Sequence, residues 1–168
     1  MSAIIDERQQ TLKAVLHYFY KDNAHSGPHS RYNLKYHIVW IPKYRRKFMV
    51  GAFAERLKEV LHEISGKYGF TIIAQEVMPD HIHLLLEAPP KYAPAKIVGI
   101  LKGVSSKLMR QEFHEEIKKH IWKENTLWAT GYYMATLSDG ATTGMVQEYI
   151  ENQKKDKNEE SGDQLKLF

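Results

Sequence analysis

The segment from Phe70 to Ala88 constrains the fold most, because it contains two strand-like runs joined by a tight turn. FTIIAQEV is rich in β-branched residues, Pro79 and Asp80 form the break, and HIHLLLEA follows as a second apolar run. β-branched and aromatic residues favour strands, and a short proline-containing break between two such runs predicts a hairpin. We therefore expect an antiparallel sheet that contains this hairpin.

Strand and helix signals alternate on both sides of the hairpin. YNLKYHIVWI reads as a strand that stops at Pro42, and a helical stripe follows with Gly69 as its C-cap. A second helical stripe precedes LWATGYYMATL, which reads as a strand, and Thr142 or Thr143 is expected to cap a last helix. The order β-α-β-β-α-β-α is typical of an α+β, ferredoxin-like (RRM-like) fold, an antiparallel sheet with helices packed on it, here with an added C-terminal helix. The residues expected to form the two helical stripes are Phe53, Leu57, Val60, Leu61, Ile64, Tyr68, Ile97, Leu101, Val104 and Leu108.

The length of 168 residues suits one domain with short extensions, and 43% apolar residues suffice for a core. We expect a helical N-terminal extension and linker over residues 1–30, the folded domain over 31–155 and a charged tail over 156–168.

The N-terminus does not resemble a signal peptide, and no apolar run is long enough to cross a bilayer, so we expect a cytoplasmic protein without a membrane partner. The absence of cysteine excludes disulfides, thiolate metal sites and a cysteine nucleophile. No phosphate-binding P-loop pattern occurs, which argues against a nucleotide cofactor.

The positive charge is unevenly distributed along the chain. The net charge is only +4, but 31–58 holds eight basic residues and one acid, and 91–110 holds five basic residues and none. Phosphates attract cations and unstacked bases stack on aromatic rings, so the cluster PKYRRK indicates nucleic-acid binding. The alternative is an ordinary solvated surface. The candidate DNA-binding residues are Lys43, Tyr44, Arg45, Arg46, Lys47, Lys102 and Lys107.

Two histidines in the predicted hairpin are candidate metal ligands. His81 and His83 are two positions apart on a strand, so both imidazoles point to one face, while Ile82 points to the other. Two neutral imidazoles on one face make half of a metal site, although incidental histidines on a half-exposed strand would look the same. His37, in the first strand of the domain, reads as an ordinary structural residue.

The predicted last helix carries two further candidates. Tyr149 and Gln153 are four positions apart and share a helical face. The amide oxygen of Gln153 is a ligand for a hard cation, and the phenol of Tyr149 is a nucleophile. The alternative is that Tyr149 packs beside Val146 and Ile150 and that Gln153 is plain helix surface.

Five motifs in this order, YHIVWIPKYRRK, MPDHIHLLLE, LKGVSSKLMR, GYYMAT and QEYIENQ, resemble those of the single-strand transposases of the IS200 family, the TnpA-type HUH nucleases. These enzymes carry a histidine–hydrophobic–histidine pair and one catalytic tyrosine. The resemblance spans residues 31 to 155 and includes the LKLF-type end of the tail.

The resemblance implies roles for individual residues. His81 and His83 match the histidine pair, Gln153 matches the third protein ligand of Mg²⁺ or Mn²⁺, and Tyr149 matches the nucleophile. It also implies a homodimer that binds hairpin ends of an insertion sequence as single-stranded DNA, and that cleaves and rejoins strands through a 5′-phosphotyrosine. Because imidazole ligands suit Mn²⁺ at least as well as Mg²⁺, we expect Mn²⁺ to support activity.

Three other functions remain open at this point. A domesticated relative acting on chromosomal repeats would carry the same residues. A non-catalytic nucleic-acid binding module would also use a basic, aromatic surface on this fold, although no RNA-recognition signature occurs. A metal hydrolase would use His81 and His83 and would keep its activity without Tyr149.

Overall fold

The computed structural model describes residues 25–27, 29–121, 126–137 and 141–152, and the chain divides into two compact units, 1–33 and 34–168. In the first unit His25–Gly27 (β1) and Ser30–Tyr32 (β2) pair as a short antiparallel hairpin, whereas the sequence had predicted only a helix and a linker before residue 31. A Cβ on Gly27 would lie 2.8 Å from the Ser30 hydroxyl oxygen, a contact that a change in the Ser30 side-chain rotamer would relieve. The helix expected in the N-terminal extension and the charged tail lie outside the described residues.

The second unit contains the predicted order of strands and helices. Its elements are Lys35–Trp40 (β3), the 3₁₀ turn Lys43–Arg45 (η1), Gly51–Tyr68 (α2), Thr71–Met78 (β4), His81–Glu87 (β5), Pro94–Glu112 (α3), His114–His120 (α4), Tyr133–Leu137 (β6) and Ala141–Asn152 (α5). The sequence did not predict α4, and it predicted a longer β6. Thr142 and Thr143 lie inside α5 rather than at its cap, because the helix begins at Ala141.

The four strands form one antiparallel sheet in the order β4-β5-β3-β6. Counted along the unit this order is 2-3-1-4, which is the ferredoxin-like arrangement, and the predicted fold class is confirmed. β4 and β5 form the predicted hairpin, with Met78 opposite His81 across the turn. As expected, α2 ends at Gly69, whose φ of 73° lies in the left-handed region and whose N–H donates to the Ser65 carbonyl.

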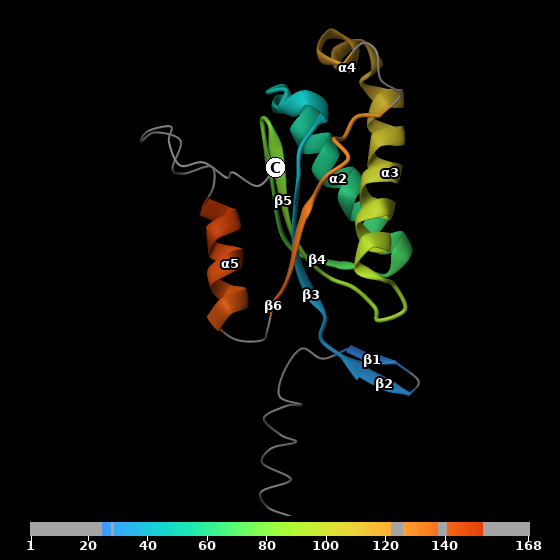
Figure 1. Ribbon diagram of the computed structural model, residues 1–168, viewed down its shortest axis with the longest axis vertical. Helices are drawn as coiled ribbons and strands as arrows, with labels where there is room; N and C mark the ends of the chain where they lie inside the picture. The colour runs from blue at the N-terminus through green and yellow to red at the C-terminus, as the bar shows by residue number, and fades with distance from the viewer. Residues whose placement is uncertain (1–24, 28, 122–125, 138–140, 153–168) are drawn as a thin grey trace, which may run out of the picture. The chain divides into compact units, whose positions relative to one another are not determined.

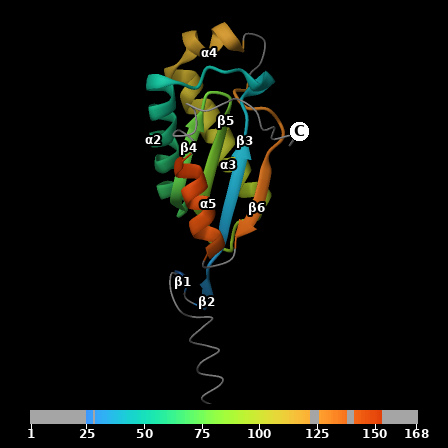
Figure 2. The same cartoon turned by 90° about the vertical axis from the view of Figure 1, so that its left-hand side faces the viewer.

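Helices cover both faces of the sheet, but unequally. α2 and α3 pack side by side on one face, and α5 lies against the other (Figures 1 and 2). The α2/α3 face buries the main hydrophobic core, which includes Ile38, Trp40, Ile82, Leu84 and Leu86 of the central strands. Under α5 the buried apolar cluster comprises Ala74, Leu85 and Ile150.

Within the described parts of the chain, no helix is both long enough and apolar enough to span a membrane.

Candidate active site

The two motif histidines lie on the α5 face of the central strand β5. Because side chains alternate along a strand, Ile82 and Leu84 point into the α2/α3 core while the histidines point the other way. His83 is 1% exposed, and its strand neighbours are Val39 on β3 and Glu76 on β4. The imidazoles of His81 and His83 meet edge to face, with ring centroids 5.0 Å apart. The predicted pairing of the two side chains on one face is therefore present.

Each histidine uses its Nδ1 atom for a partner outside the pair. Nδ1 of His81 lies 2.6 Å from Oδ1 of Asp80 in the hairpin turn. Nδ1 of His83 lies 3.2 Å from Nε2 of His37 on the neighbouring strand β3. Contacts of this kind hold the rings in place and leave the Nε2 atoms for another ligand.

Burial keeps the deeper histidines neutral. Desolvation, followed by the charges of His81 and His37, lowers the pKa of His83 to about 3. Desolvation also lowers the pKa of His37. A neutral imidazole is the form that donates a lone pair to a metal, so protonation does not compete for His83 near neutral pH.

The polar atoms of this site fit a divalent cation. Nε2 of His83 is buried and has no hydrogen-bond partner among the residues that the structure describes. A buried lone pair without a donor costs free energy unless something polar or charged meets it, and a cation would. No group of three or more His, Asp or Glu able to hold a metal occurs in the described ranges, and Gln153 lies outside them. The two histidines therefore supply part of a coordination sphere, and other ligands must complete it.

Helix α5 places Tyr149 beside this pair. Ile150 is buried against Ala74 and Leu85, Val146 packs one turn earlier, and Tyr149 stands next to them on the helix. The Tyr149 ring meets the His83 ring edge to face, with centroids 5.7 Å apart and planes at 88°. Tyr149 is also 48% exposed, so it combines contact with the site and access from solvent. The structure thus brings together Tyr149, His81 and His83 within one chain.

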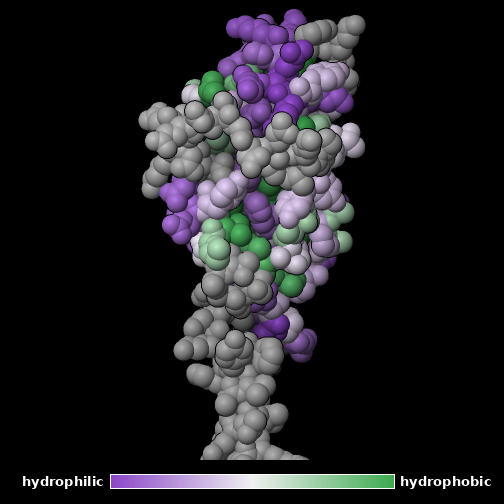
Figure 3. All heavy atoms as spheres, turned by 60° about the vertical axis from the view of Figure 1, so that its left-hand side comes forward, coloured by the Kyte–Doolittle hydropathy of each residue, from purple (hydrophilic) through white to green (hydrophobic). Residues whose placement is uncertain are grey.

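This side of the second unit differs in polarity along its length. Figure 3, which brings the α5 side forward, shows apolar residues gathered in its middle and polar residues concentrated at the end where α4 lies. Met145 and Tyr149 of α5 are among the large apolar side chains exposed to solvent, at 69% and 48%.

The basic loop that contains η1 lies against the hairpin turn next to His81. The backbone N–H groups of Phe48 and Met49 both donate to the Pro79 carbonyl at 3.1 Å, which ties the loop to the turn. Nε of Arg45 donates to Oδ2 of Asp80 at 3.2 Å. Arg45 therefore contacts the carboxylate that holds His81, and its side chain remains 52% exposed.

The backbone of this loop is held in an unusual conformation. Tyr44 and Arg45 have φ values of 60° and 52°, a region that non-glycine residues rarely adopt. Two hydrogen bonds hold the backbone there: Lys43 N–H donates to the Leu127 carbonyl at 2.8 Å and Arg45 N–H to the Pro42 carbonyl at 2.9 Å. Tyr44 is 61% exposed, and Nζ of Lys43 lies 5.9 Å from the centroid of its ring.

Partial burial acts to raise the pKa of Asp80, but the hydrogen bond from His81 and the charges of His81 and Arg45 outweigh it. The net pKa of Asp80 is lower than usual. An ionised Asp80 between a histidine and an arginine favours the Nδ1–H form of His81.

Lys102 and Lys107, which the sequence had grouped as candidate DNA-binding residues, both lie on α3 but have different surroundings. Nζ of Lys102 donates to the carbonyls of Ala129, Thr130 and Gly131 at 2.7, 3.1 and 2.9 Å, so its ammonium holds the segment that leads into β6. Burial lowers the pKa of Lys102. These contacts occupy all three ammonium protons, which gives Lys102 a structural role that the sequence did not suggest.

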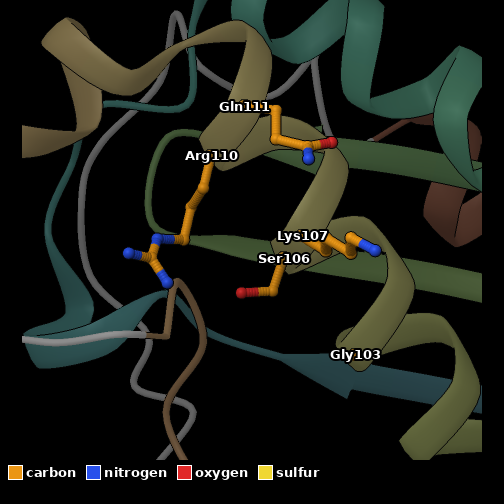
Figure 4. A pocket seen from close by; sticks show the side chains of 5 residues that line it. All are labelled: Gly103, Ser106, Lys107, Arg110 and Gln111. Atoms are coloured by element: carbon orange, nitrogen blue, oxygen red, sulfur yellow. The ribbon is translucent and has the colours of Figure 1, made fainter.

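Lys107 lies one and a half turns further along α3, in a hollow on the outer surface. The hollow has a volume of about 420 Å³ and is lined by Gly103, Ser106, Lys107, Arg110 and Gln111. In Figure 4 Lys107 and Arg110 extend to either side of Ser106. This basic hollow lies on the α2/α3 side of the sheet, opposite the face that carries His81 and His83.

Sequence reasoning missed His37 and Asp80 as members of the site. Asp80 directly precedes His81, and a carboxylate beside a candidate ligand was a signal that the turn interpretation overlooked. His37 lies 46 residues before His83 in the chain, and only the pairing of β3 with β5 brings the two rings together.

Comparisons with known proteins agree with one another. A sequence model of the family described as "Transposase IS200 like" matches residues 30–153. The chain is 41% identical over 122 residues to the ISDra2 transposase TnpA of Deinococcus radiodurans, a match that covers 73% of this chain and 85% of that protein. It is 35% identical over 139 residues to the transposase for insertion sequence element IS200 of Salmonella typhimurium, covering 83% of this chain and 88% of the relative.

Two solved structures resemble the fold. A transposase from Deinococcus radiodurans R1, solved by crystallography, superposes with a TM-score of 0.62 at 38% identity, covering 77% of this chain and 97% of that one. A REP-associated tyrosine transposase bound to a REP hairpin superposes with a TM-score of 0.56, covering 79% of this chain and 74% of the other. At 12% identity the second match concerns the fold alone.

Proposed function

The chain belongs to the IS200-like transposase family, and on that premise we propose that it cuts and rejoins single-stranded DNA through a phosphotyrosine formed at Tyr149. A transposase is an enzyme that cleaves and rejoins DNA. The proposal adds the identity of the nucleophile, the divalent metal, the single-stranded substrate and the hairpin form of the element's ends.

The observation that carries the proposal is the contact between Tyr149 and His83. An exposed phenol stands edge to face against a buried, neutral imidazole whose Nε2 has no hydrogen-bond partner among the described residues. A purely structural tyrosine would bury its ring and would not need two oriented histidines beside it. A nucleic-acid binding module would leave this arrangement without a purpose.

The proposed reaction needs no external energy source. The phenol of Tyr149 loses its proton, and its oxygen attacks the phosphorus of a backbone phosphate. The bond from phosphorus to the 3′ oxygen breaks, the 3′ oxygen takes up a proton, and the 5′ phosphate stays on Tyr149. Attack of a second 3′-OH on this phosphotyrosine restores a phosphodiester and releases Tyr149. One ester bond is exchanged for another at each step, which agrees with a sequence that has no P-loop.

His81 and His83 would hold Mg²⁺ or Mn²⁺ through their Nε2 atoms, with Gln153 as a further ligand. Such a cation polarises a phosphate and offsets its negative charge, which favours attack by an anionic oxygen. The chain's own contribution is to hold both imidazoles through Asp80 and His37, and to keep His83 neutral by burial.

The basic loop and the α3 hollow would contact the DNA backbone. Nζ of Lys43 lies 5.9 Å from the centroid of the exposed Tyr44 ring, and Arg46 and Lys47 follow in the same loop. This combination of cations and an aromatic ring suits an unpaired strand entering next to His81. Lys107 and Arg110 on the opposite side would meet phosphates of a hairpin stem, away from the chemistry. Lys102 is left out of this surface because its ammonium already binds three carbonyls.

We also propose that the protein acts as a homodimer. Among the described residues β6 is an edge strand of the sheet, paired with β3 on one side and with no strand on the other, so a strand of a second copy could pair there. Light scattering after size-exclusion chromatography tests this directly. A mass of one chain at assay concentrations would contradict it.

The decisive experiment is a denaturing gel with the full chain and labelled single strands that carry the element's ends, with Mg²⁺ and Mn²⁺ in separate reactions. Wild type and Tyr149→Phe run side by side, with the same DNA as a duplex for comparison. We expect a protein-linked band from single strands with either metal, and none from the variant.

Other outcomes identify other functions. Cleavage that persists in Tyr149→Phe without a linked band would show a metal hydrolase. Binding without cleavage would show a recognition module. A linked band from chromosomal repeats, with none from the element's own ends, would show a domesticated nuclease.

A further inference from the structure

His83 is held from a strand outside the motif that contains it. Nε2 of His37 lies 3.2 Å from Nδ1 of His83, and the two rings are nearly parallel, with planes at 11° and centroids 5.4 Å apart. His37 sits on β3, between β5 and β6, where it is paired across from Leu85 and Ala135. A residue on a central strand has little freedom to move, so this contact is a fixed part of the site.

The direction of the hydrogen bond decides what His83 can do. Each neutral imidazole carries one N–H, and only one of the two nitrogens in this contact can hold a hydrogen. One ring therefore donates and the other accepts. If His37 donated, the proton of His83 would sit on Nε2, a buried N–H without an acceptor among the described residues. That arrangement would leave a buried donor unpaired and would present a proton, rather than a lone pair, to a cation. If His83 donates from Nδ1, its Nε2 is a lone pair, which a cation can satisfy.

We propose that His37 is a positioning residue that accepts the Nδ1 proton of His83 and so keeps Nε2 of His83 unprotonated for a divalent metal. This inference rests on the metal site of the proposed function. Metal-binding histidines almost always donate their second ring N–H to a partner that sets tautomer and ring angle. A histidine is an unusual choice for that partner, since carboxylates and backbone carbonyls are the common ones.

The surroundings of His37 suit an acceptor. His37 is partly buried on β3 beside His83, and a neutral imidazole there offers the lone pair of its Nε2 as an acceptor. The rings of His37 and Tyr133 also meet in a T-shaped arrangement, with centroids 6.0 Å apart and planes at 73°. A neutral acceptor leaves His83 and the cation free of an added negative charge, in contrast to the carboxylate of Asp80 beside His81.

The first test is the tautomer of His83 in the metal-free protein. Long-range ¹H–¹⁵N spectra of the ¹⁵N-labelled full chain at neutral pH distinguish a proton on Nδ1 from one on Nε2, and a His83→Gln sample assigns the signals. We expect the proton of His83 on Nδ1 and the Nε2 of His37 unprotonated. A proton on Nε2 of His83 would overturn the proposal.

The second test compares two replacements of His37 that differ in one property. His37→Phe keeps a ring of similar size but has no acceptor, whereas His37→Gln offers an amide oxygen at a similar reach. Mn²⁺ affinity is measured without DNA, by water proton relaxation. We expect His37→Phe to weaken Mn²⁺ binding about 10- to 100-fold, and His37→Gln to recover most of that loss. Circular dichroism melts show whether both variants fold.

The outcomes separate this inference from the proposed function. Equal Mn²⁺ affinity in wild type and His37→Phe would overturn the positioning role. Equal, complete loss in both variants would make His37 a direct ligand instead. If wild type binds no Mn²⁺, the metal part of the proposed function fails, and the tautomer of His83 still decides whether His37 is its acceptor.

Discussion

The two faces of the sheet are built for different purposes. The face under α2 and α3 is filled by close-packed apolar side chains, with Ile38, Ile82 and Leu84 completely buried. The face under α5 buries His83, Glu76 and Lys35 among few apolar residues, and α5 itself is anchored through Ile150. The first face supplies stability through the hydrophobic effect, and the second gives up part of that stability for oriented polar groups.

Successive residues of β5 show this contrast at the shortest range. Leu84 and Ile82 point to one face, and His83 between them points to the other. Substitutions on the two faces should therefore have different consequences, one for folding and one for chemistry.

The largest effect is expected from His83→Ala. Loss of a metal ligand should reduce strand cleavage by about 1000-fold or more, because a catalytic metal lowers the activation barrier by several kcal/mol. Binding of single-stranded DNA should persist, since phosphate contacts elsewhere supply the affinity. Gel assays and fluorescence anisotropy measure the two properties, with His62→Ala on the exposed surface of α2 as the control. Equal loss of binding and cleavage would make His83 structural.

Leu84→Ala should have the opposite profile. It leaves a cavity in the packed face and should lower the free energy of unfolding by about 2–5 kcal/mol. Activity per folded molecule should change little, because Leu84 points away from Tyr149. Urea unfolding monitored by circular dichroism measures the first quantity. A large loss of specific activity in a folded Leu84→Ala sample would show that the faces are not independent.

Acidification should lower the free energy of unfolding through His83, on the polar face of the sheet. The pKa of His83 is held at about 3, below the ordinary 6.5 of histidine. Between these values the unfolded chain binds a proton that the folded chain does not, so stability falls as pH falls, by up to about 1.4 kcal/mol per pH unit. Urea unfolding of the metal-free protein from pH 7 to pH 4 measures this slope. The slope should be shallower in His83→Gln, whose amide does not titrate, and an identical slope would contradict the assignment.

Lys102→Met tests whether a basic residue of α3 belongs to folding rather than to DNA binding. Removal of the ammonium leaves three carbonyls without their donor and should lower the free energy of unfolding by about 1–3 kcal/mol. DNA affinity should stay near that of wild type. A selective loss of DNA affinity without loss of stability would return Lys102 to the binding surface.

The smallest effect is expected from Lys107→Gln, which removes the charge of the other candidate lysine on the same helix. Stability should hardly change, while DNA affinity should fall modestly and the slope of affinity against salt should decrease by about one counterion. Anisotropy titrations between low and moderate salt measure the slope. An unchanged slope would place the DNA elsewhere than the α3 hollow.

Local patterns were sufficient for most of the fold. The hairpin at Pro79 and Asp80, the helix that ends at Gly69 and the shared face of the motif histidines all depend on short-range periodicity and turn chemistry, and all are present. The pattern failed for α4 and for the hairpin in the first unit, which are short elements with weak periodicity. The role of Gln153 and the helical extension stay predictions, because both lie outside the described residues.

The features of the site also fall into those that the sequence predicted and those that it did not. The sequence by itself determined the pair His81 and His83, the tyrosine on the last helix and the presence of a basic loop, because each is a spacing along a single element or a contiguous run. Only the tertiary structure decided that His37 supports His83, that Arg45 reaches Asp80, and that Lys102 and Lys107 serve different ends. Those relations join residues far apart in the chain. They arise from strand pairing and from the orientation that each side chain adopts in the folded protein. Local sequence preferences specify neither of these.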